Sequence, residues 1–415
     1  MWHVKPGSHE VVYPSQRIFA AGHRKAWTRR VKFLLFAGIM HVHMENSGIA
    51  VLQKTEPVMR VANLAEQIDR LTAPGELYEK LEGDKVRCFA CAHRCLIRDG
   101  QRGICQVRFN HAGVLYVPYG YTVGLNPDPI EKKPLYHVLP GATALTFGML
   151  GCDFHCPFCQ NWLTTQALRD EAAGVPPRPI TAEQVIDLAL QSGSRAVISS
   201  YNEPLITAEW AAAIFKLAKQ AGLLTGFVSN GHATPEVLDY LRPVTDCYKV
   251  DLKSMRQENY RRMGGQLRHV LATIEGLHQR GYWVEVVTLV IPGFNDSDAE
   301  LRETADFIAS VSPDIPWHVT AFHRDYKMRD AENTPPRTLL RAAEIGVQAG
   351  LHFVYVGNIP GHLPQWETTW CPQCRTALVV RYGYWIESYN ITPDGRCPKC
   401  QMAIPGRWWT HEQHR

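Results

Sequence analysis

The stretch GCDFHCPFCQN, from Gly151 to Asn161, places three cysteines within eight residues, at Cys152, Cys156 and Cys159. A structural zinc site and a complete iron–sulfur site each use four protein ligands. Three thiolates at this spacing can surround a four-iron cluster from one loop and leave one iron open to another molecule. The spacing therefore predicts a catalytic cluster. The alternatives are three unrelated buried thiols, or a zinc site completed by His155 or a distant residue.

Apolar runs and amphipathic stretches alternate between Ala144 and Gly357, which is typical of parallel β/α units. Seven apolar runs are the predicted strands: Leu145–Leu150, Ala196–Ser199, Leu223–Val228, Cys247–Leu252, Trp283–Ile291, Trp317–Phe322 and Phe353–Val356. Helices are predicted between them, among others at Ala182–Leu190, Ala208–Ala221, Ala299–Val311 and Thr338–Ala349. The pattern predicts an α/β fold, a partial or nearly complete β/α barrel, with a doubly wound open sheet as the rival topology.

Polar residues follow the predicted strands at the place where β/α barrels carry their functional groups, the carboxyl ends of the strands. They are Glu203 in YNEP, Ser229 and Asn230 in SNG, Asp251 and Lys253 in DLK, and His323 in AFH. Taken singly, each has a structural explanation as a helix cap, a turn residue or a member of a surface ion pair. Their shared position beside a loop of three thiols predicts one functional rim.

The composition is that of an ordinary globular protein, with 45% hydrophobic and 20% charged residues among 415. The net charge of +4 comes from the first 60 residues, where nine Lys or Arg face three Asp or Glu; the rest holds 35 against 37. The main body is therefore not a basic nucleic-acid binder. The apolar run Phe33–Met40 is far shorter than the ~18 residues of a membrane span, so we expect no membrane association and a cytoplasmic location.

The other cysteines also occur at short spacings, which in a reducing compartment indicates metal rather than disulfides. In the tail, Cys371-x2-Cys374 and Cys397-x2-Cys400 flank 22 residues with a β-rich segment, which predicts a zinc ribbon. We expect this ribbon to pack beside the rim.

A second group of four thiols precedes the barrel, at Cys88, Cys91, Cys95 and Cys105. Their spacing predicts either zinc or an auxiliary iron–sulfur cluster, and His93 could replace Cys95 as a ligand. The single Cys247 would lie ~13 Å below the rim on its strand, which predicts a buried apolar residue and not a fourth cluster ligand.

These observations predict four parts: an extension of uncertain role at 1–75, a Cys-rich segment at 76–140, the core barrel at 141–362 and the ribbon module at 363–415. The extension shows one short helical pattern, at Val61–Leu71. Its Arg-rich start is compatible with a transit peptide or with a start codon read too far upstream. In the second case Met40, Met44 and Met59 are later candidates.

The cysteine loop, with Phe158 just before its third cysteine, resembles the cluster motif of radical S-adenosylmethionine (SAM) enzymes. The runs KVDLKSMRQENYRRMGG, from Lys249, and VTLVIPGFND, from Val287, resemble the branch of the pyruvate formate-lyase activating enzyme. More narrowly, RCFACAHRCLIRDGQRGICQVRFN, YVGNIPGH and CPKCQMAIPGRW are similar to the radical SAM member of the AmmeMemoRadiSam system, which occurs with Memo-like proteins. The resemblance implies a partial barrel of the radical SAM type with about six or seven parallel strands.

The resemblance also implies roles for the rim. Cys152, Cys156 and Cys159 would hold a [4Fe–4S] cluster whose open iron binds SAM, and reductive cleavage of SAM would give a 5′-deoxyadenosyl radical that abstracts hydrogen from a substrate. The SAM site would consist of Phe158, Asn202, Glu203, Ser229, Asn230, Asp251, Lys253 and His323. Glu203 would meet the SAM ammonium group and Lys253 its carboxylate. Tyr201 and Asn202 stand where relatives carry two glycines.

Three functions follow as hypotheses. The first is a radical SAM enzyme with an unknown small-molecule or peptide substrate, supplied with electrons by flavodoxin or ferredoxin and working beside a Memo-like partner. The second is an activase that places a glycyl radical in a large partner protein. The third is a non-catalytic zinc or RNA-binding protein built around the ribbon.

Overall fold

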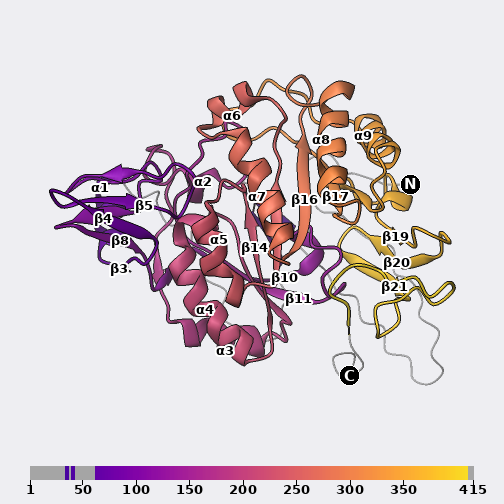
Figure 1. The fold of residues 1–415 in the computed structure, drawn as a ribbon, viewed down its shortest axis with the longest axis horizontal. Helices are drawn as coiled ribbons and strands as arrows, with labels where there is room; N and C mark the ends of the chain where they lie inside the picture. The colour runs from indigo at the N-terminus through magenta and orange to yellow at the C-terminus, as the bar shows by residue number, and fades with distance from the viewer. Residues whose placement is uncertain (1–32, 37–38, 43–60, 410–415) are drawn as a thin grey trace. The chain divides into compact units, whose positions relative to one another are not determined.

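The computed structural model describes residues 33–36, 39–42 and 61–409 (Figure 1). The hairpin of β1 (Phe33–Phe36) and β2 (Ile39–Val42) belongs to one compact unit, residues 1–57, and residues 58–415 form a second unit. Of the predicted start positions, Met44 and Met59 lie outside the described residues, as does the Arg-rich segment before β1. Within the described residues no helix is both long and apolar enough to cross a membrane.

The second unit is built around an eight-stranded sheet in the order β10-β11-β13-β14-β15-β16-β17-β18. Only β10 (Gly124–Pro129) is antiparallel to its neighbour, β11 (Thr143–Gly148). The parallel strands continue with β13 (Ala196–Ser199), β14 (Leu224–Ser229), β15 (Cys247–Asp251), β16 (Trp283–Val290), β17 (Trp317–Ala321) and β18 (Val354–Gly357).

All seven predicted strands are confirmed, and their spatial order follows their order in the chain. A doubly wound sheet would reverse that order at a switch point, so the rival topology is wrong. The two outer strands, β10 and β18, are not paired with each other. The sheet is therefore a partial barrel, as predicted.

Helices alternate with the strands and cover the outside of the barrel (Figure 1). They are α2 (Trp162–Thr165), α3 (Ala182–Gln191), α4 (Ala208–Gln220), α5 (Pro235–Leu241), α6 (Gln257–Met263), α7 (Leu267–Gln279), α8 (Asp298–Val311) and α9 (Pro336–Gln348). The start of α3 shows why these boundaries were predictable, since Thr181 and Gln184 form a reciprocal capping box.

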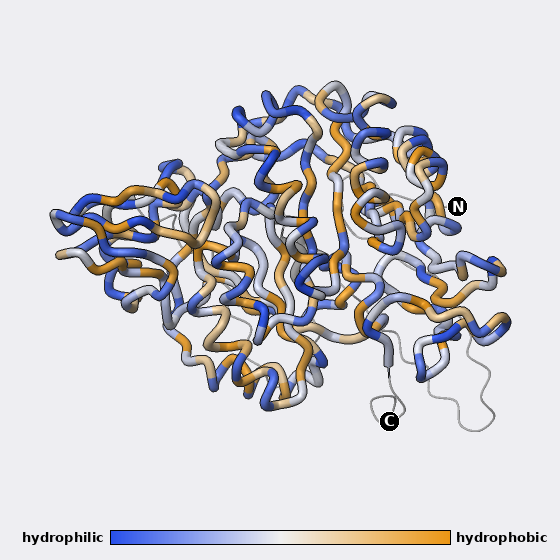
Figure 2. The backbone as a smooth tube through the Cα atoms, viewed as in Figure 1, coloured by the Kyte–Doolittle hydropathy of each residue, from blue (hydrophilic) through white to orange (hydrophobic). Residues whose placement is uncertain are grey.

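Burial of the strands on both faces explains their apolar composition. Every residue of β13 and β17 is buried, and Figure 2 shows apolar residues concentrated along the central strands. Inside the barrel, Cys247 packs with Ala196 and Ile198 and has no exposed surface. It is thus a buried small residue, as predicted.

The Cys-rich segment folds as two small antiparallel sheets after α1 (Val61–Asp69). One sheet contains β3 (Thr72–Pro74), β8 (Val114–Pro118) and β7 (Phe109–His111), and the other contains β4 (Tyr78–Leu81), β5 (Lys85–Cys88) and β6 (Leu96–Ile97). A buried ion pair attaches this segment to the barrel: Arg108 donates to both carboxylate oxygens of Glu209 on α4, at 2.8 and 2.6 Å. Two short strands, β9 (Tyr121–Thr122) and β12 (Arg178–Pro179), pair beside it.

The tail forms a three-stranded antiparallel sheet of β19 (Thr369–Trp370), β20 (Ala377–Tyr382) and β21 (Trp385–Tyr389), the predicted ribbon. Its core packs against Tyr136, before β11, and against Phe353 and Tyr355 at the start of β18. Buried Arg381 fixes this position by donating to the Tyr136 carbonyl at 2.7 Å. The ribbon therefore lies at the amino ends of the strands, and the expected packing beside the rim is wrong.

Candidate cluster and cofactor site

The cysteine loop leaves β11 through Gly151, whose φ of +94° lies in the left-handed region. A Cβ at Gly151 would lie 2.8 Å from Val107 Cγ1 and 3.1 Å from Ile206 Cδ1, so no larger residue fits there without displacement. Farther along the loop, the His155 amide donates to the Met263 carbonyl at 2.9 Å. The loop is thereby held between the Cys-rich segment and the end of α6.

The three thiols of the loop are buried or half-buried. Burial raises the pKa of all three, and that of Cys156 to about 12, so the unligated thiols are protonated at neutral pH. Binding of a metal centre would displace those protons, which is the usual coupling between thiolate ligation and pH. His155, the alternative zinc ligand, is exposed and packs on Gly264.

Glu203 follows β13 and joins the carboxyl ends of two strands. One carboxylate oxygen accepts hydrogen bonds from the Ser229 hydroxyl at 2.7 Å and the Leu205 amide at 3.1 Å, and the other accepts the Asn230 amide at 2.8 Å. Burial, followed by the nearby charge of Asp153, raises the pKa of Glu203 to about 8. Among the described residues no cationic side chain forms an ion pair with this buried carboxyl group, and one oxygen retains room for a further donor.

Asn230 connects this carboxyl group to the cysteine loop. Its side-chain nitrogen donates to Asp153 Oδ1 at 2.7 Å and lies 3.9 Å from Cys152 Sγ. Asn202, by contrast, bonds the backbone at both ends: its oxygen accepts the Met149 amide at 3.0 Å and its nitrogen donates to the Glu203 carbonyl at 3.1 Å. Of these two predicted SAM residues, only Asn230 points to the cysteines.

Tyr201 turns away from the cysteine loop. It has a φ of +67°, and its hydroxyl group donates to Asp128 Oδ2 at 2.7 Å, where Lys133 also binds. A Cβ on Gly148 would lie 2.7 Å from Tyr201 Cβ, so the glycine makes room for the Tyr201 side chain. Sequence reasoning missed Asp128 and Lys133 because they lie on and beside β10, outside the strand-end pattern.

Asp251, the last residue of β15, forms a chain of charges with Lys249 on the same strand and Lys253 just beyond it. The ammonium groups of Lys249 and Lys253 both bind Asp251, the latter at 3.3 Å. Burial alone would lower the pKa of Lys253, but the charge of Asp251 outweighs it and raises that pKa above its usual range. Lys253 therefore stays charged beside the cysteine loop, as the rim prediction requires.

The two remaining predicted residues flank the third cysteine. Phe158 is buried and packs edge-to-face on Phe294, with ring centroids 5.5 Å apart. His323 is exposed, and its Nε2 lies 3.0 Å from the side-chain nitrogen of Gln160. Phe158 thus connects the loop to Phe294 through packing, and His323 contacts the loop through Gln160.

Asp153 is a buried residue of the loop that sequence reasoning missed. Its carboxylate lies 3.0 Å from His232 Nδ1 and accepts the Asn230 side chain. Burial would raise the pKa of Asp153, but these bonds outweigh it and place the pKa below its usual range. Asp153 thus adds a fixed negative charge next to Cys152. Its position between Cys152 and Phe154 gives no pattern that predicts burial.

Comparisons with known proteins agree with this geometry. A family model described as the radical SAM superfamily matches residues 147–308. An uncharacterized protein of Methanocaldococcus jannaschii is 36% identical over 330 residues, which cover 79% of this chain and 97% of that protein. The chain belongs to the radical SAM superfamily. The pyruvate formate-lyase 1-activating enzyme of Escherichia coli K12 is 24% identical over 231 residues, 51% of this chain and 91% of that enzyme.

Solved radical SAM structures overlap with this chain in part. The crystal structure of a radical SAM methyltransferase from Sphaerobacter thermophilus aligns with a TM-score of 0.42 and 17% identity, over 52% of this chain and 66% of that one. Radical SAM proteins use a [4Fe–4S] cluster and SAM. The three loop cysteines, with polar side chains on one flank, fit such a cluster with one iron open.

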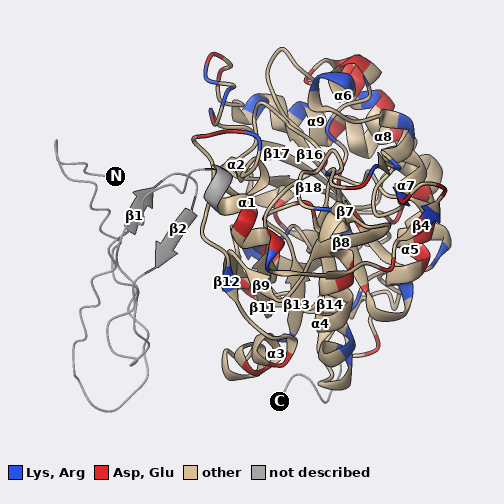
Figure 3. Ribbon diagram, turned by 90° about the vertical axis from the view of Figure 1, so that its left-hand side faces the viewer, with Lys and Arg blue, Asp and Glu red and all other residues tan. Residues whose placement is uncertain are grey.

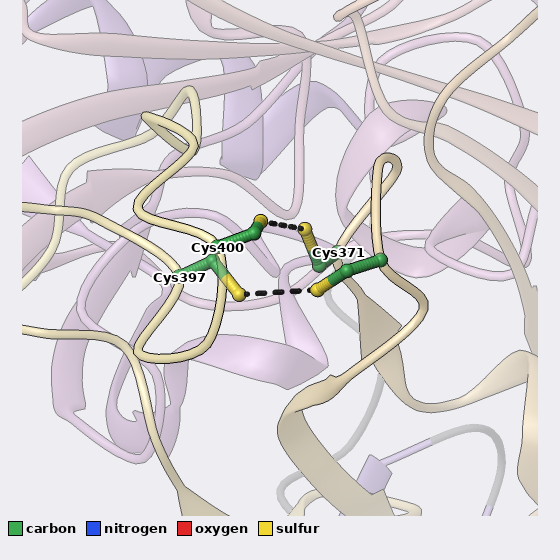
Figure 4. A group of neighbouring side chains, drawn as sticks. Cys371, Cys397 and Cys400 are labelled. Atoms are coloured by element: carbon green, nitrogen blue, oxygen red, sulfur yellow. Dashed lines mark hydrogen bonds between the residues drawn. The ribbon is translucent and has the colours of Figure 1, made fainter.

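The four tail cysteines of this radical SAM protein form a separate site. Their sulfurs all lie within 4.8 Å of one another, and two pairs, Cys371 with Cys400 and Cys374 with Cys397, are 3.5 Å apart. Figure 4 shows Cys371, Cys397 and Cys400 with their sulfurs directed toward a common centre. Four converging sulfurs leave no open position, so the site has the ligand set of a structural metal ion such as zinc.

Proposed function

We propose that this chain cleaves SAM reductively at a [4Fe–4S] cluster held by Cys152, Cys156 and Cys159 and uses the resulting 5′-deoxyadenosyl radical to abstract hydrogen from a substrate. The observation that carries the proposal is the rim itself. Lys253 and Asn230 approach the cysteine loop from two different strand ends, and Glu203 joins the second of them. When bound, the cluster would supply the electron. The protein would place charged side chains around SAM.

Glu203 fits the amino group of SAM. Its pKa of about 8 results first from burial and then from Asp153, so an incoming donor group stabilises the ionised carboxylate. Ser229 and the Asn230 amide hold that carboxylate in place before SAM arrives. A ligand whose amino group donates to Glu203 would give this carboxylate a positively charged partner.

Lys253 fits the carboxylate of SAM. Asp251, which also binds Lys249, keeps it oriented and charged, and the Lys253 side chain is only 16% exposed. Phe158 would close the adenine side through packing, and His323, on the exposed side, would bind the ribose. The Asn202 side chain would act indirectly, because its bonds fix the Met149 and Glu203 backbones.

The similarity to an activating enzyme supports the second candidate, an activase that acts on a partner protein. We favour the enzyme of the AmmeMemoRadiSam type, with a Memo-like partner and an electron donor such as flavodoxin or ferredoxin, because the motif resemblance includes the N-terminal and tail cysteines. The radical SAM match disfavours the non-catalytic RNA-binding alternative. Figure 3 shows basic and acidic residues interspersed along α6, α7 and α8, without a face of one sign on these helices.

The test is anaerobic incubation of the reconstituted protein with SAM, a reductant and each candidate partner. Formation of 5′-deoxyadenosine, dependent on Cys156, is expected from either enzyme. Deuterium transfer from a labelled partner glycine into 5′-deoxyadenosine would identify the activase, and transfer only from a small molecule or peptide would identify the first candidate. Absence of SAM cleavage with a full cluster would contradict both.

A further inference from the structure

The three cysteine groups differ in how far apart their sulfurs lie. A tetrahedral zinc site with Zn–S bonds of about 2.3 Å holds its sulfurs about 3.8 Å apart. The tail cysteines meet this requirement. In the described part of the chain, neither the loop cysteines nor any three of the N-terminal cysteines form a group within 4.8 Å. The N-terminal sulfurs, like those of the loop, are therefore less closely gathered than those of the tail.

The four N-terminal sulfurs nevertheless surround one space. Cys88, Cys91, Cys95 and Cys105 line one cavity that is partly open to solvent. Each thiolate of a four-iron cluster binds a different iron, so the sulfurs stand around a core instead of meeting at a point. A common cavity with separated sulfurs fits that arrangement better than one zinc ion.

The cavity also contains a buried donor without a partner. Arg108 lines it with 1% of its surface exposed, and both its terminal nitrogens bond Glu209. Its Nε is buried and has no hydrogen-bond partner. Sulfur atoms of a cluster accept such hydrogen bonds, which also tune the reduction potential. A bound cluster would thus satisfy a polar group that the empty cavity leaves unpaired.

We propose that Cys88, Cys91, Cys95 and Cys105 hold a second [4Fe–4S] cluster and that it exchanges electrons with the cluster of the loop. A single carboxylate separates the two ligand sets: a carboxylate oxygen of Asp153 lies within 4.8 Å of Cys91 Sγ, and its Oδ1 lies 3.8 Å from Cys152 Sγ. One electron from an external one-electron donor can enter at the N-terminal cluster, reduce it, and pass to the loop cluster, which reoxidises the first.

One competing site includes Cys91. Its sulfur, Asp153 and His232 lie close enough to share one metal ion. The Asp153 carboxylate, however, already accepts Asn230 and lies 3.0 Å from His232 Nδ1, so an ion at this place would have to displace the contact between Asp153 and His232. The competing site predicts a zinc ion and no iron at the N-terminal segment. The use of the second cluster rests on the proposed function, but its presence does not.

The experiment removes the loop cluster and asks what iron remains. The full-length variant Cys152→Ala/Cys156→Ala/Cys159→Ala is reconstituted anaerobically with iron and sulfide. We expect about four iron and four sulfide per chain, and a paramagnetic signal after dithionite reduction. Adding Cys88→Ser and Cys105→Ser to this variant leaves two thiolates in the segment and should remove that iron while circular dichroism and tail zinc are unchanged. No iron in the triple variant, or a second zinc per chain, would overturn the proposal.

A second measurement tests whether the two clusters lie close together, and it does not require SAM cleavage. In the fully reduced wild type, two neighbouring paramagnetic clusters should broaden and split each other's resonance, and this interaction should be absent from the triple variant. If both clusters are present but the spectrum is the sum of two isolated ones, the route through Asp153 is wrong. If the interaction is present and SAM is not cleaved, the proposed function fails and the second cluster stands.

Discussion

The carboxylate of Glu203 accepts the backbone amide of Asn230 at 2.8 Å and thereby ties the carboxyl end of β13 to that of β14. The next polar contact of Asn230 is with Asp153 in the cysteine loop. Three segments far apart in the chain thus meet through the backbone and side-chain amides of Asn230 and two carboxylates. Because every member is buried, a change at one position is transmitted to the others.

The elevated pKa of Glu203 predicts a pH dependence of SAM binding. The group is protonated below a pH of about 8 and ionised above it, and only the ionised form accepts the SAM amino group through either oxygen. Affinity should therefore rise with pH on the acid side of this pKa, by up to about tenfold per pH unit. Glu203→Gln should flatten this rise. Since titration of SAM itself is common to both proteins, the difference in their Kd profiles isolates Glu203. Parallel profiles would refute the assignment.

Removal of Lys253 should weaken SAM binding without loss of the cluster. Lys253→Ala deletes a charge-assisted contact of about 1.5–3 kcal/mol, which corresponds to about 10- to 150-fold in Kd. Iron content should be unchanged, because the ammonium group is not a ligand. Lys216→Ala, an exposed lysine on the barrel's α4 helix, is the control and should bind normally. Equal affinity in both variants would mean that the SAM carboxylate lies elsewhere.

Cys156→Ala should abolish SAM cleavage together with the loop cluster. Two thiolates cannot hold a four-iron cluster that already has one open iron. The visible absorbance and the iron content should fall by the amount that the loop cluster contributes to each, while tail zinc is retained. Full iron content in this variant would contradict the assignment of the loop.

Zinc in the tail should be structural and independent of iron. Cys371→Ser with Cys374→Ser removes two of four converging ligands, so about one zinc per chain should be lost. Iron content should persist, because the ribbon lies at the amino ends of the strands, away from the loop. Limited proteolysis should then cleave first within the tail. A proportional loss of iron would show that the tail holds a cluster.

The strands and the polar residues at their ends could be predicted from the sequence, but the contacts between distant segments could not. Buried parallel strands require continuous apolar runs, which is why seven strands could be located, and the carboxyl ends of those strands supplied Glu203, Asn230 and Lys253. The burial of Asp153 could not be predicted, because it depends on His232, 79 residues away in the chain. The ribbon was misplaced for the same reason: its position depends on Arg381 meeting Tyr136.

A glycine far from the cysteines in sequence should control the shape of their loop. A Cβ at Gly265 would lie 2.2 Å from Cζ of Phe154, a buried side chain between Cys152 and Cys156. Gly265→Ala must displace that ring, at a cost of about 1–3 kcal/mol for overpacking, and the loop moves with it. We expect a lower iron occupancy of the loop cluster and slower SAM cleavage, with tail zinc intact.

The matched control for Gly265 is Gly276→Ala in α7. There the new Cβ meets first the flexible end of Arg280, at 3.1 Å, so the side chain can move away and helix propensity improves. Thermal unfolding and iron analysis of both variants separate a general loss of stability from a local effect on the loop. If Gly265→Ala keeps full iron and activity, Phe154 does not position the loop. If both variants lose iron equally, the effect is one of global stability.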